Sequence, residues 1–165
     1  MIFVILGTQR FQLNRLLKEI DELIEKGEIT EEVIAQIGVS DYKPKNYKFY
    51  RYIDKIQFDE YIARASLVIT HSGVGSIITA LKAKKPVVVY PRLQKYREHV
   101  DDHQLDIAKA FEKMNYVLCR HKEDTLSDVM NRCKEYPFVE YIKNTNEISA
   151  IITAFLDKEY KKTPI

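Results

Sequence analysis

Six consecutive residues combine a histidine, two serines and two glycines: His71, Ser72, Gly73, Val74, Gly75 and Ser76. The apolar run Leu67–Thr70 precedes them and a helix-like stretch, Ile77–Lys84, follows them, so we expect a turn between a strand and a helix. Glycines let a backbone approach a ligand closely, and the free N–H groups that begin a helix favour an anion. The spacing predicts a phosphate or diphosphate site; a tight turn without a ligand is the alternative.

A second set of polar side chains follows the next apolar run, Pro86–Tyr90, and a polar loop, Pro91–Glu98. There, Asp102, His103 and Gln104 stand where another helix is expected to begin. Aspartates are common in the first turn of a helix, so capping explains part of this composition. The functional alternative is that these three side chains bond the hydroxyl groups of a polyhydroxylated ligand.

Apolar runs alternate along the chain with stripes of helical period. The expected strands lie at residues 2–6, 34–38, 48–53, 67–70, 86–90 and 116–119, and the expected helices at 13–24, 58–64, 77–84, 105–111, 126–133 and about 145–158. The strands show no clean polar–apolar alternation, which is typical of a parallel sheet covered on both faces. We predict one α/β domain over residues 1–165, a Rossmann-like doubly wound parallel sheet with helices on both faces.

In such a sheet, ligands bind beyond the carboxyl ends of the strands. The loop that begins Gly7-Thr8, the 71–76 turn and the 91–104 segment are therefore expected to converge. Gly7-Thr8 does not complete the GxGxxG fingerprint of dinucleotide-binding domains, so an NAD-dependent oxidoreductase is the weaker alternative. The 71–76 turn also lacks the P-loop motif.

Composition indicates a folded domain that does not bind nucleic acid. The 165 residues are 45% hydrophobic and 30% charged, with a formal net charge of +2, which is too balanced for a nucleic-acid footprint. No run approaches the roughly 18 apolar residues that span a bilayer, and Met1 leads directly into a strand-like run. We therefore expect a cytoplasmic protein with a short, solvated basic tail.

Cysteines and histidines predict no metal site. Cys119 and Cys133 lack metal-ligand spacing, and Cys133 continues a helical apolar stripe, so we expect it in the core. His99 and His103 are four residues apart, but neither a third ligand nor an HExxH motif accompanies them.

Three blocks within residues 71–111 resemble glycosyltransferases of the MurG type: His-Ser-Gly-Val-Gly-Ser, Lys-Lys-Pro-Val-Val-Val-Tyr-Pro-Arg and His-Val-Asp-Asp-His-Gln. Gly7-Thr8-Gln9 and Tyr52-Ile53-Asp54 also fit. The chain resembles the C-terminal, donor-binding half of a GT-B fold. It is similar to the soluble subunit of split bacterial transferases for capsule and exopolysaccharide, and to the donor subunit of the dolichol-linked GlcNAc transferase.

This resemblance implies an inverting transfer of sugar from a UDP-sugar to a polyprenyl-diphosphate-linked acceptor, without a metal cofactor. It also implies a membrane-anchored partner subunit that binds the acceptor and recruits the chain to the inner face of the plasma membrane. The general base is not located on this chain and is expected on the partner.

Roles for individual residues follow from the same resemblance. The resemblance implies that the diphosphate is bound by His71, Ser72, Gly73, Val74, Gly75 and Ser76. Gly7 and Thr8 would approach it from the first loop. His71 and the N–H groups of the helix would stabilise the charge that develops on the leaving group. Tyr52 and Ile53 would lodge the uracil ring, with strand-end core as the alternative, and Asp102, His103 and Gln104 would contact the sugar.

One position departs from the family pattern. Thr79 stands where the wider superfamily has a glutamate that bonds the ribose hydroxyls, and a threonine cannot accept two hydrogen bonds from a diol as a carboxylate does. A non-catalytic subunit that binds nucleotide sugar or enhances a partner therefore remains an alternative. Arg92, Lys95 and Arg97 form a basic loop, which we interpret as solvated charge rather than as a contact for an acidic sugar or acceptor phosphate.

Overall fold

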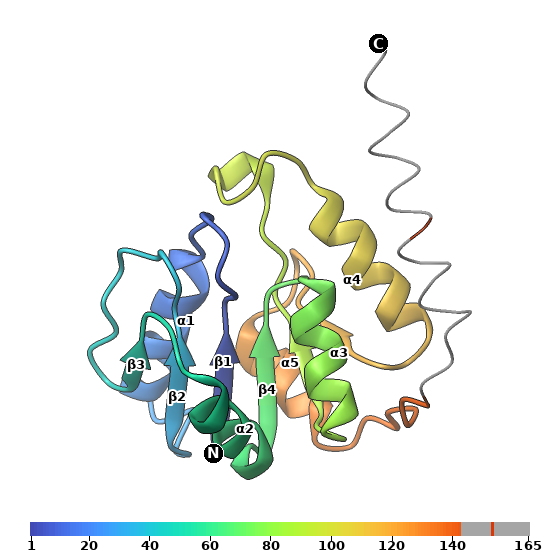
Figure 1. Ribbon diagram of the computed structural model, residues 1–165, viewed down its shortest axis with the longest axis horizontal. Coiled ribbons are helices and arrows are strands. Elements are labelled where there is room, and N and C mark those ends of the chain that lie inside the picture. Colours follow the sequence, from blue (N-terminus) through green and yellow to red (C-terminus); the bar gives the residue numbers. More distant parts are fainter. Residues whose placement is uncertain (143–152, 154–165) are drawn as a thin grey trace.

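Six parallel strands form a single sheet in the computed structural model, which describes residues 1–142 and 153 (Figure 1). In chain order they are β1 (Ile2–Ile5), β2 (Val33–Gln36), β3 (Lys48–Tyr50), β4 (Leu67–Thr70), β5 (Val87–Val89) and β6 (Leu118–Cys119). Their order across the sheet is β3-β2-β1-β4-β5-β6, and every neighbouring pair is parallel. The predicted Rossmann-like doubly wound α/β fold is confirmed.

Helices cover both faces of this sheet (Figure 1). They are α1 (Asn14–Glu25), α2 (Lys55–Arg64), α3 (Val74–Lys82), α4 (His103–Lys113) and α5 (Leu126–Cys133), with a short 3₁₀ turn, η1 (Gln94–Tyr96), before α4. One core cluster joins the sheet to α1 and α5, and it includes Cys133 as expected. The other joins the sheet to α2, α3 and α4.

The central strands are buried along their whole length, which explains the absence of alternation in their sequences. In the ladder, Ile5 of β1 is level with Gln36 of β2 on one side and with Thr70 of β4 on the other. The loops that leave these three strands therefore start at the same height on the carboxyl edge.

The order of the strands reverses between β1 and β4. After β1 the chain enters α1 on one face, and after β4 it enters α3 on the other face. Loops that diverge in this way leave a crevice at the carboxyl edge, and this is where open α/β sheets bind ligands. The two loops in question begin at Gly7 and His71.

Two local expectations are wrong. Helix α3 begins at Val74 rather than at Ile77, so Gly75 and Ser76 belong to its first turn. The 91–98 segment is not simply a solvated loop, because Arg92 and Glu98 are buried.

Some expectations stay as predictions. The final helix at about 145–158 and the basic tail lie outside the described residues, and the assignment of residues 1–165 to one domain remains a prediction. Within the described part of the chain, no helix has both the length and the apolarity to cross a membrane.

Candidate functional site

The guanidinium of Arg92 ties together two of the loops at the carboxyl edge. This side chain is fully buried just after β5. Its Nη2 donates to the carbonyl oxygens of Leu6 at 2.7 Å and Phe11 at 3.0 Å, and its Nε donates to that of Gln12 at 3.2 Å. Arg92 therefore holds the loop after β1 against the loop after β5, and the expectation of solvated charge is wrong for this residue.

Gln104 joins the third loop to the other two. Its side chain is buried in the first turn of α4, and its Oε1 accepts hydrogen bonds from the backbone N–H of Arg92 at 3.0 Å and of Ser72 at 3.3 Å. The predicted convergence of the three segments therefore rests on contacts of Arg92 and Gln104. Because Oε1 of Gln104 already accepts these two hydrogen bonds, Gln104 would contact a ligand through its amide NH₂ group.

A salt bridge fixes the outer part of the loop after β5. The guanidinium of Arg15, in α1, lies 2.9 Å from Oε2 of the buried Glu98 and stacks between the rings of Tyr90 and Tyr96 at 4.5 and 4.6 Å. Glu98 in turn accepts the backbone N–H of Leu93 at 3.1 Å. This segment is therefore held on both sides, by Arg92 inside and by Arg15 outside.

The imidazole of His71 is buried and neutral. Its Nδ1 lies 3.3 Å from the carbonyl oxygen of Ile5, and because a carbonyl only accepts, Nδ1 carries the proton and Nε2 keeps a lone pair. Burial and the nearby charge of Arg92 lower the pKa of His71 from 6.5 to about 3. In the free protein Nε2 of His71 therefore offers a lone pair rather than a donor, and the expected contact of His71 with a diphosphate stays a prediction.

Two glycines make room for this imidazole ring. Gly73 has an ordinary φ of −72°, but a Cβ on it would lie 2.3 Å from Nε2 of His71. Gly7 has a φ of +73°, which favours glycine, and a Cβ there would lie 2.8 Å from Cε1 of the same ring. A Cβ on Gly75 would meet only open space. Of the three glycines, Gly75 is therefore the one that leaves the surface accessible to a ligand.

The N-terminus of α3 presents unsatisfied donors at the switch point between β1 and β4. Gly73 is the N-cap, and no side chain caps the helix, so the N–H groups of Val74, Gly75 and Ser76 lack the partners that an N-cap side chain would provide. Beneath them, the hydroxyl of Ser72 is buried without a hydrogen-bond partner among the described residues. Free N–H groups and a helix dipole at one point favour a bound anion.

An aspartate between two histidines was missed in the sequence. Oδ1 of Asp101 lies 3.0 Å from Nδ1 of His99 and accepts the backbone N–H of His103 at 3.0 Å. Oδ2 of Asp101 lies 3.4 Å from Nε2 of His103. The His99 ring lies 4.4 Å from the ring of Phe11, in the first loop. A shared carboxylate thus orients both histidines; Asp101 belongs to the block His-Val-Asp-Asp-His-Gln in the sequence, but no role was assigned to it there.

The predicted sugar contacts differ in their exposure. Asp102 is exposed and accepts the backbone N–H of Gln94 at 2.8 Å, which anchors η1. The side chain of His103 is 12% exposed, and Gln104 is buried. Of the three, Asp102 is the most open to solvent.

Tyr52 and Ile53 lie at the same edge, beyond β3, which is two strands away from β1. Tyr52 is 54% exposed, whereas Ile53 is half-buried and donates its N–H to Oε1 of Gln36 at 3.3 Å. They stand before α2, which covers the same face as α3. Thr8 is exposed in the first loop, and exposed Thr79 donates its hydroxyl to the carbonyl oxygen of Gly75 at 2.7 Å.

Two hollows border the site. One, of about 540 Å³, lies among Lys95, Asp102, Lys109, Arg120 and His121. The other, of about 650 Å³, follows the exposed side of α1 and includes Arg97. Lys95 and Arg97 thus stay at the surface, in contrast to Arg92.

The strand order, its switch point between β1 and β4 and the uncapped start of α3 define a Rossmann-like domain that forms one half of a GT-B fold. Residues 1–155 match the glycosyltransferase family 28 C-terminal domain, and the chain belongs to this family.

Relatives and solved structures agree with this assignment. The UDP-N-acetylglucosamine transferase subunit ALG13 of Candida albicans is 32% identical over 81 residues, which cover 49% of this chain and 26% of that protein. The glycotransferase of kitacinnamycin superposes with a TM-score of 0.62 at 16% identity, over 99% of this chain and 43% of that one. The solution structure of ALG13 gives 0.55 at 19% identity, over 90% of this chain and 91% of that one. These structural likenesses show the fold.

We predict that His71 makes the protein sensitive to acid. Since its pKa is about 3 in the folded state and near 6.5 when unfolded, the unfolded chain binds the proton first, and stability falls as the pH drops from 6.5 towards 3. In His71→Asn, the side-chain amide replaces the Nδ1–H donor. The free energy of unfolding, measured with urea, should fall less steeply with decreasing pH in this variant than in the wild type, by up to about 1.4 kcal/mol per pH unit. Parallel curves for the two proteins would contradict the neutral, buried imidazole.

Proposed function

We propose that this chain is the donor-binding, catalytic subunit of an inverting glycosyltransferase that moves a sugar from a UDP-sugar to a lipid-linked acceptor. The observation that carries the proposal is the uncapped N-terminus of α3, which lies at the switch point of a family 28 domain. The Candida relative, a UDP-N-acetylglucosamine transferase subunit, supports a UDP-sugar donor and a partner subunit.

In this proposal the diphosphate lies over the first turn of α3. The N–H groups of Val74, Gly75 and Ser76 bond its oxygens, and Gly7 and Thr8 approach from the first loop. Arg92 stays buried and acts through its charge, while neutral His71 positions the turn by filling the space between Gly7 and Gly73. These groups stabilise the charge that develops on UDP as the bond from the anomeric carbon to the diphosphate oxygen breaks.

The remaining parts of the donor and the acceptor are assigned by position. Tyr52 and Ile53 offer an exposed and partly apolar surface for uracil, and Asp102, His103 and the NH₂ group of Gln104 face the sugar. The acceptor hydroxyl attacks the opposite side of the anomeric carbon, and its proton passes to a base on the partner subunit. No metal is required for donor binding in this scheme.

We place the reaction in capsule or exopolysaccharide synthesis. The acceptor is a sugar on a polyprenyl diphosphate, and a membrane-anchored partner presents it to the cytoplasmic chain at the inner face of the plasma membrane. Lys95, Lys109 and Arg120 line the hollow beside Asp102, and their charges would attract an anionic acceptor.

Thr79 favours a second candidate, a subunit that binds nucleotide sugar or enhances its partner without doing chemistry. Its hydroxyl is engaged by the carbonyl oxygen of Gly75, so it offers the ribose only lone pairs. The two candidates differ in whether the partner transfers sugar without this chain.

Two glycine substitutions test the site. Gly75→Ala introduces a Cβ into open space, so it should keep the stability of the fold or raise it by roughly 0.5–1 kcal/mol, yet weaken UDP binding about tenfold or more by calorimetry. In Gly73→Ala the new Cβ clashes with the imidazole of His71, so this variant should lose both stability and affinity for UDP. Unchanged UDP affinity in a stable Gly75→Ala variant would remove α3 from the site.

Activity is tested on the chain reconstituted with its membrane partner and a polyprenyl-diphosphate-linked sugar. UDP-GlcNAc, UDP-glucose, UDP-galactose and UDP-glucuronate are compared as donors, and transfer to lipid is measured. We expect transfer only when both proteins are present. Transfer by the partner alone would favour the non-catalytic candidate, and robust turnover by this chain alone would contradict the split enzyme. Thermal stabilisation by NAD but not by UDP would contradict both.

A further inference from the structure

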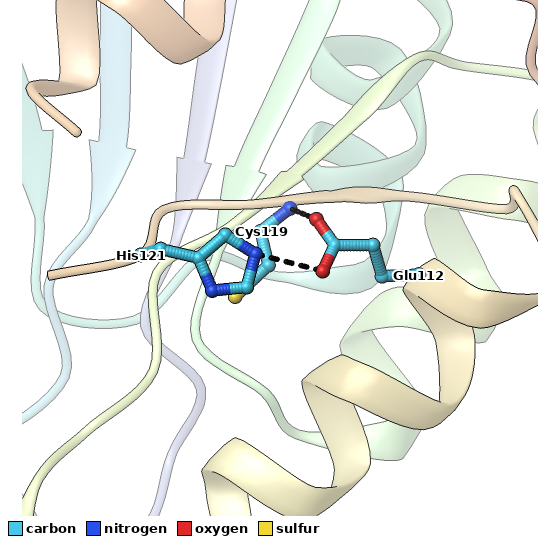
Figure 2. A group of neighbouring side chains, drawn as sticks. All are labelled: Glu112, Cys119 and His121. Atoms are coloured by element: carbon cyan, nitrogen blue, oxygen red, sulfur yellow. Dashed lines mark hydrogen bonds and ion pairs between the residues drawn. The ribbon is translucent and has the colours of Figure 1, made fainter. Parts of the chain in front are cut away.

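Glu112, Cys119 and His121 bring a carboxylate, a thiol and an imidazole together at the edge of the sheet. One ligand atom from each lies within 4.8 Å of the other two. Glu112 comes from the last turns of α4, Cys119 ends β6, and His121 follows two residues later. Figure 2 shows the imidazole facing the carboxylate, with the sulfur of Cys119 beside the ring.

The carboxylate is already oriented by its neighbours. Oε1 of Glu112 accepts the backbone N–H of Cys119 at 2.8 Å, which leaves Oε2 facing Nε2 of His121, also at 2.8 Å. The backbone N–H of His121 is bonded by Asp124 at 3.3 Å. Supporting contacts of this kind hold ligands in place around protein metal sites.

We propose that Glu112, Cys119 and His121 bind a zinc ion. Sulfur, imidazole nitrogen and carboxylate oxygen are the ligands that zinc takes in proteins, at about 2.3 Å for sulfur and about 2.0–2.2 Å for nitrogen and oxygen. These bond lengths place tetrahedral ligand atoms about 3.3–3.8 Å apart, so adjustments of about 1 Å suffice to close the site. Binding releases the thiol proton to solvent, and water takes the fourth position.

Burial fits a site that is closed on the Cys119 side and open on the His121 side. Cys119 is 1% exposed, and its backbone N–H is fixed by the carboxylate of Glu112. The imidazole of His121 is 40% exposed and lines the 540 Å³ hollow, which gives an ion an entry path. Lys109 and Arg120 also line this hollow, and the charge of Arg120 is paired with Glu19 at 3.8 Å.

A bound ion would strengthen the weakest part of the sheet. Among the described residues, β6 has two residues and its one neighbouring strand is β5, paired through Leu118 and Cys119. The ion would join this strand to α4, whose first turn carries His103 and Gln104. The inference does not depend on the proposed transferase activity.

Cobalt(II) reports directly on the thiolate. We expect the reduced, metal-free full-length chain to develop a thiolate-to-cobalt charge-transfer band that saturates at one equivalent and disappears when zinc is added. Cys119→Ser should abolish the band, whereas Cys133→Ser, which removes the other buried cysteine, should retain it. Zinc should raise the Tm of the wild type and of Cys133→Ser but not that of Cys119→Ser.

His121→Ala removes a partly exposed side chain and keeps the test valid if Cys119→Ser does not fold. It should weaken cobalt affinity by more than about tenfold, since changes even to supporting residues cost that much. The absence of a charge-transfer band in the wild type, its persistence in Cys119→Ser, or unchanged affinity in His121→Ala would each overturn the proposal.

Discussion

A positive charge buried at the carboxyl edge of the sheet is the constraint on which the site depends. Removing a guanidinium from water is costly, and burial lowers the pKa of Arg92 to about 10, which still leaves it charged at neutral pH. Three carbonyl oxygens of the 6–12 segment offset part of this cost. An anion on the neighbouring turn would offset more of it, so the charge that organises the loops also favours the ligand we propose.

Burial, together with the same charge, lowers the pKa of His71 and keeps its imidazole neutral. A neutral imidazole packs between Gly7 and Gly73, and it sets the path of the chain from β4 into α3. Gln104 then bonds the turn and the loop after β5 through a single oxygen. In the proposed site, anion binding is left to backbone N–H groups, which need no change of protonation to act.

Local patterns in the sequence were enough to predict the fold. Buried strands without alternation, amphipathic stripes and the 71–76 turn each report on nearby residues, and parallel strands bring their following loops to one edge. The role of Arg92 could not be predicted, because its partners are about eighty residues away and its neighbours Lys95 and Arg97 are solvated. Spacing also gave no reason to group Glu112 with Cys119 and His121, which meet only because α4 packs beside β6.

The most direct test of the central claim is to titrate the ¹⁵N-labelled chain with UDP and follow the backbone amide resonances by NMR. We expect the largest shifts on Val74, Gly75 and Ser76, with smaller ones at Gly7 and Thr8. Binding that leaves the amides of α3 unmoved, or that shifts mainly those of Lys109 and Arg120 beside the 540 Å³ hollow, would contradict it.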